Sequence, residues 1–265
     1  MLLAIDVGNT NIVLGVFDGG RLTNSWRLAT LRERTADEMG ILVRQLFTSN
    51  GLDAARIKGI IISSVVPQLT RPMEDMARQY FGREALTVDP ASNSGMPVLY
   101  TPPSDVGADR VVNAVAAYER YGRAEKKPLI VVDFGTATTF DAISAAGEYV
   151  GGVICPGIGI SADALFQRAA RLPRVDVRKP PSIVGQTTVT SMQAGLFFGY
   201  VSMVDGIVQR MRAELPSGDR AECIATGGMA DILARETTSI QRVESELTLL
   251  GLKIIWERAG VERHT

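Results

Sequence analysis

AIDVGNTNIVLGVFDGG, residues 4–20, has the pattern of a β-hairpin: an apolar strand, a polar turn and a second apolar strand. The turn between the strands carries Asp6, Gly8, Asn9, Thr10 and Asn11. Asn-Gly or Asp-Gly alone is enough to connect two strands, so this turn holds more polar side chains than a hairpin needs. A similar stretch, IVVDFGTATTFDAISAAGE, returns at residues 130–148.

The two stretches stand at equivalent places in the two halves of the chain, because Asp133 follows Asp6 by about half of the 265 residues. Each half opens with a strand that ends in Asp-x-Gly and continues with strands mixed with helices. We therefore expect an α/β protein made of two related halves, 1–106 and 107–265, each a mixed sheet flanked by helices. Two such halves facing each other leave a cleft between them, where ligands commonly bind.

Apolar periodicity and end signals predict the helices. The helix expected over 35–51 begins with a capping box of Thr35 and Glu38, and the one over 70–82 has Pro72 in its first turn. Residues 189–215 form one long helix, or two that meet near Gly199 or Gly206. Further helices are expected at 107–122, 160–172, 229–236 and 246–260.

Composition excludes several classes of protein. A net charge of -1, from 28 basic and 29 acidic side chains, does not give the positive electrostatic field that nucleic-acid-binding proteins use. Cys155 and Cys223 lie in apolar runs, as expected of core residues in a reducing cytoplasm. No signal peptide or membrane span is expected. The single histidine, His264, stands in the polar end of the chain, which argues against catalysis by a Ser-His-Asp or Cys-His site.

The repeated turns suit phosphate binding. Gly8 and Gly135 allow a ligand to approach the main chain, and neighbouring Asn and Thr side chains add neutral donors such as Thr136 and Thr138. Asp6 and Asp133 cannot bind phosphate directly, so a cation such as Mg²⁺ is the natural intermediary. The alternative is that both are ordinary hairpin turns rich in turn-forming residues.

Two other nucleotide-binding patterns are weaker. The chain lacks the G-x-x-x-x-G-K-[ST] signature of P-loop proteins. GIGISA, residues 157–162, fits the dinucleotide fingerprint G-x-G-x-x-A. The strand before it belongs to a hairpin, so we interpret these glycines as a site of close helix–strand packing.

Six motifs follow one another along nearly the whole chain: DVGNTNIVLGVF (6–17), YTPPSDVGADR (100–110), VVDFGTATTFD (131–141), GGVICPGI (151–158), GQTTVTSMQAG (185–195) and ATGG (225–228). With these motifs in view, the sequence resembles the type III pantothenate kinases. The resemblance implies an actin-like (ribonuclease H-like) fold and phosphorylation of pantothenate by ATP, the first step toward coenzyme A. It also implies a cytoplasmic homodimer that uses Mg²⁺-ATP and a monovalent cation, K⁺ or NH₄⁺.

The resemblance assigns the nucleotide and metal positions. Asp6 lies near Mg²⁺, in contact with it through water, Asp133 binds the monovalent cation, and Thr226 to Gly228 lie by the adenosine. The ATP-binding residues are Asp6, Val7, Gly8, Asn9, Thr10, Asn11, Ile12, Val13 and Thr136.

The resemblance makes Asp109 the general base. A carboxylate suits phosphoryl transfer, which needs alignment and little covalent help. Asp109 is expected in the first turn of its helix, where the helix dipole keeps it ionised; the alternative is a helix-start acid without a catalytic role. The substrate-binding positions are Tyr100, Gly107, Ala108, Asp109, Arg110 and Thr188.

Each substrate position also has a structural alternative. Arg110 suits the pantothenate carboxylate, or is a solvated helix charge. Tyr100 contacts pantothenate or fills the core. Thr188 contacts pantothenate from the partner subunit, caps a helix, or does both. One departure from the family is Gln186, at a position that is commonly basic.

Competing functions share parts of this pattern. Another sugar or acyl kinase would keep both turns but lack GADR with Tyr100 upstream. A non-catalytic ATP-binding regulator would keep the turns and lose the base, and a DNA-binding activator would need a basic element. The Phe-, Met- and Gly-rich helix over 189–215 suits a dimer interface or a core.

Overall fold

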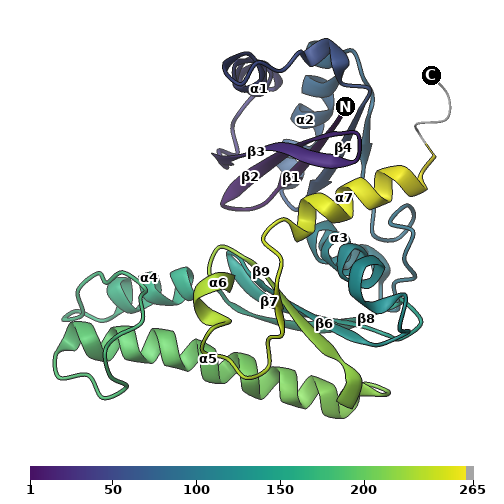
Figure 1. Ribbon diagram of the computed structural model, residues 1–265. Coiled ribbons are helices and arrows are strands. Elements are labelled where there is room, and N and C mark those ends of the chain that lie inside the picture. The colour runs from purple at the N-terminus through teal and green to yellow at the C-terminus, as the bar shows by residue number, and fades with distance from the viewer. Residues whose placement is uncertain (261–265) are drawn as a thin grey trace. The chain divides into compact units, whose positions relative to one another are not determined.

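The computed structural model describes residues 1–260 (Figure 1), so His264 lies outside the described residues. The chain forms two compact units, Met1–Ala116 together with the chain from Leu247 on, and Ala117–Glu246. These units differ from the division at 106 and 107, because the last helix packs on the first sheet. The Trp256 ring occupies the space where a Cβ on Gly59 would lie.

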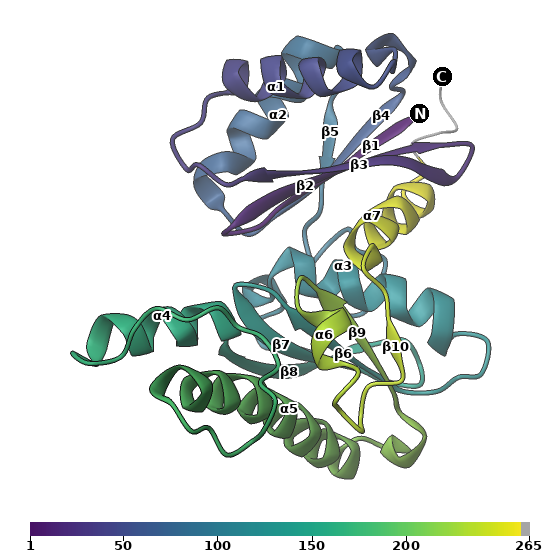
Figure 2. The same cartoon turned by 60° about the vertical axis from the view of Figure 1, so that its left-hand side comes forward.

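The first unit is built on a mixed sheet of five strands in the order β3-β2-β1-β4-β5. β1, β2 and β3 are antiparallel neighbours, whereas β4 and β5 run parallel to β1. Figure 2 shows α1 and α2 over one face of this sheet and α7 below the other. Its elements are β1 (Leu2–Val7), β2 (Asn11–Asp18), β3 (Arg21–Ala29), α1 (Ala36–Ser49), β4 (Gly59–Ser64), α2 (Pro67–Phe81), β5 (Ala85–Thr87), α3 (Ala108–Ala117) and α7 (Leu247–Arg258).

The second unit repeats this topology with the order β10-β9-β6-β7-β8. β6, β7 and β8 are antiparallel, and β9 and β10 run parallel to β6, so β6 is the counterpart of β1 and β9 that of β4. The expected internal repeat is therefore confirmed. Its elements are β6 (Leu129–Phe134), β7 (Ala137–Ile143), β8 (Tyr149–Pro156), α4 (Ile158–Arg168), α5 (Thr188–Glu214), β9 (Glu222–Gly227), α6 (Ala230–Leu233) and β10 (Arg242–Val243).

Several helices differ from the sequence-based bounds. α2 begins at Pro67, a residue that suits the first helical position because its missing N–H has no helical partner there. Pro72 therefore lies inside this helix and not in its first turn. α3 ends at Ala117 and continues as a π-helical turn to Gly122. α6 is only four residues long.

The capping box of α1 is confirmed, since the Thr35 Oγ1 accepts from the Glu38 N–H and the Glu38 carboxylate accepts from the Thr35 N–H. Short 3₁₀ turns occur at Ala54–Arg56, Pro103–Asp105 and Gly218–Arg220.

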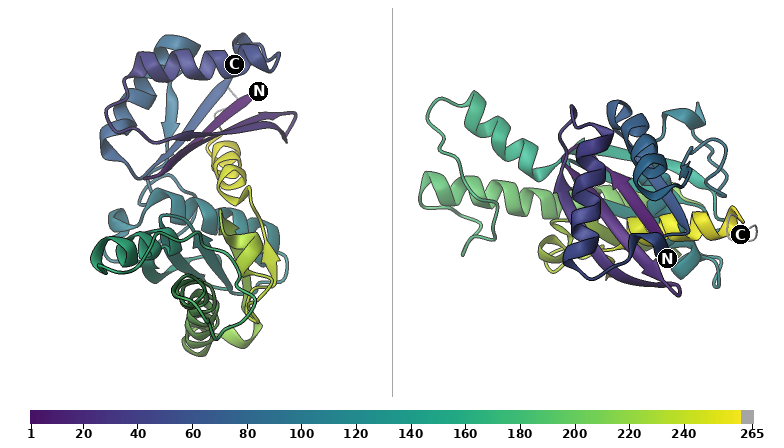
Figure 3. Two further views of the ribbon diagram at one scale, coloured as in Figure 1. Left: turned by 90° about the vertical axis from the view of Figure 1, so that its left-hand side faces the viewer. Right: turned by 90° about the horizontal axis from the view of Figure 1, so that it is seen from above.

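α5 is one continuous helix of 27 residues. Its residues Phe197, Val204 and Val208 are buried against Ile130 and Val132 of β6, which holds the helix straight across the sheet despite its glycines. The right-hand view of Figure 3 shows α4 alongside α5. No described helix is long and apolar enough to cross a membrane.

Candidate active site

The first polar turn joins β1 to β2 and is held by the backbone. The Gly8 N–H donates to the Asn11 carbonyl at 3.0 Å, and the Thr30 hydroxyl donates to the Gly8 carbonyl at 2.7 Å. A Cβ on Gly8 would lie 3.0 Å from the Asn11 oxygen, so glycine keeps the turn tight. The side chains of Asn9 and Thr10 are exposed.

Two of the positions assigned to ATP have side chains in the core. Val7 and Ile12 are fully buried on the face that packs against α1 and α2. Their side chains are therefore unavailable, and only the backbone of these residues could contact a nucleotide.

The second turn joins β6 to β7 and is one residue shorter. Asp133 pairs with Thr139, whereas the equivalent Asp6 pairs with Val13. The Gly135 N–H donates to the Ala137 carbonyl at 3.0 Å, and Thr136 is exposed. Thr138 is only 1% exposed, so it is not the ligand donor that its position in the sequence suggested.

Gly157 sits against this second turn. Its N–H donates to the Thr136 carbonyl at 3.1 Å, and that carbonyl occupies the space a Cβ on Gly157 would need. GIGISA therefore serves close packing of α4, which follows the hairpin strand β8, and not a dinucleotide site.

The strand beside each turn also approaches its aspartate. β4 places Ser63 opposite Asp6, and β9 places Thr226 opposite Asp133. Gly227 has a φ of +92°, and a Cβ there would lie 2.6 Å from the Asp133 Oδ1. The absence of a side chain at Gly227 therefore leaves room for this carboxylate beside β9.

Asp109 lies in the first turn of α3, as expected. Its Oδ1 accepts a hydrogen bond from the Arg110 N–H at 2.7 Å. Burial raises the pKa of this carboxyl, and the hydrogen bond and the charge of Arg110 lower it only in part. The effect of burial therefore opposes the helix dipole, which was expected to keep Asp109 ionised. A raised pKa suits a general base, because such a group works best when its pKa lies near the working pH.

The segment before Asp109 is packed on the end of β4. A Cβ on Gly107 would lie 3.5 Å from Val65, the residue that follows β4, and 2.6 Å from the Asp109 Oδ1. Val7 and Ser64 are partners in β1 and β4, so the first turn and Asp109 belong to one edge of the first unit. Ser63 and Val65 were not among the predicted site residues, although they stand at the end of the apolar strand β4, where ligand-binding residues gather in α/β sheets.

Arg110 is buried, with 7% of its surface exposed, so the interpretation as a solvated charge is wrong. A buried arginine requires anionic or hydrogen-bonding partners. Tyr100 lies in the loop after β5 and is half-buried, which leaves part of its ring accessible.

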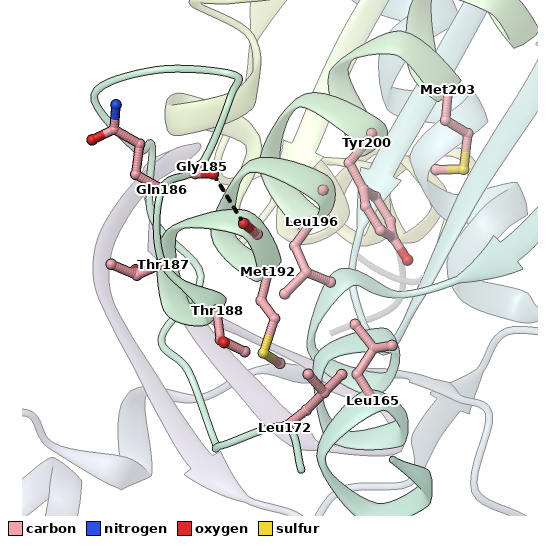
Figure 4. Close-up of a pocket in the computed structure, with 13 residues that line it drawn as sticks. Leu165, Leu172, Gly185, Gln186, Thr187, Thr188, Met192, Leu196, Tyr200 and Met203 are labelled. Atoms are coloured by element: carbon pink, nitrogen blue, oxygen red, sulfur yellow. Dashed lines mark hydrogen bonds between the residues drawn. The ribbon is translucent and has the colours of Figure 1, made fainter. Parts of the chain in front are cut away.

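A pocket of about 740 Å³ lies in the second unit between α4, the start of α5 and the chain before it (Figure 4). Figure 4 shows Met192 and Leu196 of α5 directed toward Leu165 and Leu172. Thr188 lines this pocket and is exposed. The polar lining residues are Gln186, Thr187, Thr188 and Ser191.

The cap of α5 is Thr187, not Thr188. The Thr187 Oγ1 accepts from the Thr190 N–H at 3.2 Å, and the Thr190 Oγ1 accepts from the Thr187 N–H at 3.0 Å. Thr188 is the first helical residue, and its hydroxyl is not used in the cap. The alternative prediction that Thr188 caps the helix is therefore wrong.

The oxygen atoms at the two turns suit a cation that is also bound by oxygen atoms of a ligand. Among residues 1–260 no three His, Cys, Asp or Glu side chains gather as a metal site. Asp6 and Asp133 each stand beside a backbone turn, an arrangement suited to a cation that also binds phosphate oxygens and water.

A repeated mixed sheet with an Asp-x-Gly turn in each copy is the actin-like fold, found in kinases and ATPases. One solved structure with this fold is the inorganic polyphosphate/ATP-glucomannokinase from Arthrobacter sp. strain KM. The match covers 97% of this chain and 98% of the glucomannokinase chain, with a TM-score of 0.53 and 17% sequence identity.

The family model of type III pantothenate kinase matches residues 2–210. The type III pantothenate kinase of Myxococcus xanthus is 55% identical over 97% of this chain and 98% of its own. That of Anaeromyxobacter sp. (strain K) is 57% identical over 97% of this chain and 99% of its own. The chain therefore belongs to the type III pantothenate kinase family and is a kinase, which implies ATP and a divalent metal.

Proposed function

We propose that this protein transfers the terminal phosphoryl group of ATP to the hydroxyl of pantothenate, forming 4′-phosphopantothenate, with Asp109 as the general base. The observation that carries the proposal is the position of the Asp109 carboxylate. It is partly buried at the start of α3, against a glycine and beside the strand edge that bears the first polar turn.

The Asp109 carboxylate has one oxygen for orientation and one for chemistry. Oδ1 is held by the Arg110 N–H, which leaves Oδ2 to accept the proton of the attacking hydroxyl. The hydroxyl oxygen bonds to phosphorus as the bond to the ADP oxygen breaks, and the proton remains on Asp109. The base mainly orients the nucleophile, because phosphoryl transfer depends on alignment and charge neutralisation.

The nucleotide is assigned to residues of both turns. In the first unit the backbone of residues 6–13 and the exposed Asn9 and Thr10 bind phosphate oxygens, with Asp6 holding Mg²⁺ through water. Mg²⁺ neutralises charge on the phosphates and is often held in this indirect way. In the second unit Thr136 contributes from its exposed turn, and Thr226 to Gly228 lie near the adenosine.

We assign the monovalent cation, K⁺ or NH₄⁺, to Asp133. The support is the position of this carboxylate near the end of β6, beside the turn that is equivalent to the first polar turn. A large cation needs several oxygen ligands, and backbone carbonyls of the turn and phosphate oxygens can complete the set.

Pantothenate is assigned to Tyr100, Gly107, Ala108 and Arg110, where the buried guanidinium supplies a partner for the substrate carboxylate. Thr188 contributes from a partner subunit in a homodimer. Support for the dimer is a set of exposed apolar side chains around α4 and the start of α5, which we call the apolar set. It comprises Ile160, Leu165, Phe166, Ile183, Val184 and Val189.

The second candidate is a non-catalytic ATP-binding regulator of the same fold. It would keep the turns without needing Asp109, so Asp109→Asn would leave its function unchanged. A pantothenate kinase would lose turnover in this variant and keep ATP binding.

The proposal is tested by following ADP release with ATP, Mg²⁺ and pantothenate, in K⁺ and then in Na⁺. We expect release that requires pantothenate and K⁺, and we expect Asp133→Asn to lose the response to K⁺. Release that ignores K⁺ would keep the kinase and remove the cation assignment. Folded protein that binds ATP but never releases ADP on addition of pantothenate would favour the regulator.

A further inference from the structure

The hydroxyl of Ser63 is buried without a hydrogen-bond partner. Ser63 is 0% exposed, and its Oγ finds no donor or acceptor among the described residues. A buried hydroxyl is normally paired, because water is no longer available to it. Such an unpaired group in a native structure calls for an explanation, for example an ion or a functional role.

Ser63 lies beside the metal-binding aspartate of the proposed function. It is the register partner of Asp6 in the parallel pairing of β1 with β4. Register partners on neighbouring strands direct their side chains to the same face of the sheet. The neighbouring Ser64 has a local role instead, because its Oγ accepts from the Thr70 hydroxyl at 3.0 Å and from the Val66 N–H at 3.3 Å.

The internal repeat places a second hydroxyl at the equivalent position. Thr226 of β9 is the register partner of Asp133, as Ser63 of β4 is of Asp6. Thr226 is also buried, at 3% exposed. Each aspartate at a polar turn therefore has a buried hydroxyl beside it on the next parallel strand.

We propose that Ser63 is a positioning residue for the Mg²⁺-ATP site: its hydroxyl donates a hydrogen bond to the Asp6 carboxylate when Mg²⁺-ATP is bound. The bond fixes the carboxylate in the orientation that accepts hydrogen bonds from the metal's water ligands. Groups that orient metal-binding carboxylates in this way commonly change metal affinity by 10- to 100-fold when removed. The inference rests on the proposed function through the role of Asp6.

The test is Ser63→Ala, compared with Thr138→Val. Thr138 is 1% exposed and its hydroxyl also lacks a partner among the described residues, but it belongs to β7 of the second unit, on the face that carries the buried Phe140. Both variants remove an unpaired buried hydroxyl, so neither should lower the melting temperature of the ligand-free protein. This makes the pair a matched control for packing.

We expect Ser63→Ala to raise the apparent KM for Mg²⁺ about tenfold with an unchanged KM for pantothenate. It should also lose most of the Mg²⁺-dependent part of the rise in melting temperature that ATP produces. Thr138→Val should match the wild type in both measurements. Equal Mg²⁺ responses in the two variants would overturn the inference.

The thermal measurement needs no turnover, so it tests Ser63 even if pantothenate is not the substrate. Conversely, a wild-type enzyme that phosphorylates pantothenate while Ser63→Ala keeps the full Mg²⁺ response would retain the proposed function and reject the role of Ser63.

Discussion

Gly107 and Asp109 occupy adjoining space: a Cβ on Gly107 would lie 2.6 Å from the Asp109 Oδ1. The absence of a side chain at position 107 is therefore what allows the carboxylate to take its position at the start of α3. This relationship links a residue of the substrate-binding segment to the geometry of the proposed base.

Gly107→Ala should displace the Asp109 carboxylate and lower kcat about 100-fold, because a shift of about 1 Å in a reacting group has an effect of that size. The loss should not add to that of Asp109→Asn, since both changes act on one carboxylate. Steady-state kinetics of the two single variants and the double variant check this. Multiplicative losses in the double variant would show that Gly107 acts elsewhere.

Asp109→Asn should make the folded protein as stable as the wild type or more stable at neutral pH. Burial raises the native pKa of Asp109 above the 3.8 of an ordinary aspartate, so the native state binds its proton more tightly than the unfolded state. Stability therefore falls as pH rises from 3.8 through the native pKa, and the loss is complete above it. Melting temperatures at pH 4 and pH 7.5 measure the effect, and a variant less stable at pH 7.5 would contradict it.

The same raised pKa predicts an acid limb in the pH profile of kcat/KM for pantothenate. Activity should fall as Asp109 is protonated, with a midpoint above the 3.8 of an ordinary aspartate. The residual activity of Asp109→Asn, expected to be about 100- to 10,000-fold lower, should lack this limb. An identical acid limb in the variant would assign the titration to another group.

Thr187→Ala and Thr188→Ala should separate capping from substrate binding. Thr187 caps α5, so its loss should cost about 1 kcal/mol of unfolding free energy. Thr188 lines the pocket and is not used in the cap, so its loss should raise the KM for pantothenate with little change in stability. Denaturant melts and substrate titrations measure both, and the reverse pattern would exchange the two roles.

The apolar set should form the contact between subunits. Phe166 is 45% exposed on α4, and a charge there would be buried without a partner in a dimer. Phe166→Glu is expected to sediment as a monomer and to lose pantothenate turnover. Ile41→Glu, at an exposed apolar position of α1 (62%), is the control and should sediment as the wild type. A dimeric Phe166→Glu would remove this face as the interface.

Much of the fold follows from the sequence because the signals are local. The strands on either side of Asp6 and Asp133 are marked by apolar runs and turn residues, and the repeat predicted two related sheets. The start of α2 was predicted too far along the chain, because a proline such as Pro72 is typical of a first helical turn. In the structure Pro67 has that position. The extent of α5 was predicted nearly correctly, but its continuity past Gly199 and Gly206 was left open, because it depends on packing in the second unit.

Site residues could be predicted from the sequence only where a residue type that suits the reaction also stands in a recognisable motif. Asp109 was assigned as the base because GADR resembles the family's motif, but the cause of its raised pKa is burial, which depends on the tertiary structure. Ser63 carries no motif of its own, and its pairing with Asp6 appears only once the strands are in register. The cytoplasmic location and the monovalent cation stay predictions.

The most direct test of the central claim is the mass of the product formed from pantothenate, ATP and Mg²⁺ by the wild type and by Asp109→Asn. The account predicts that the wild type converts pantothenate into a species carrying one added phosphoryl group, with one ADP formed for each. Asp109→Asn should bind ATP as tightly and form this product at least about 100-fold more slowly. Unmodified pantothenate after prolonged incubation with the wild type, or equal rates in the two proteins, would contradict it.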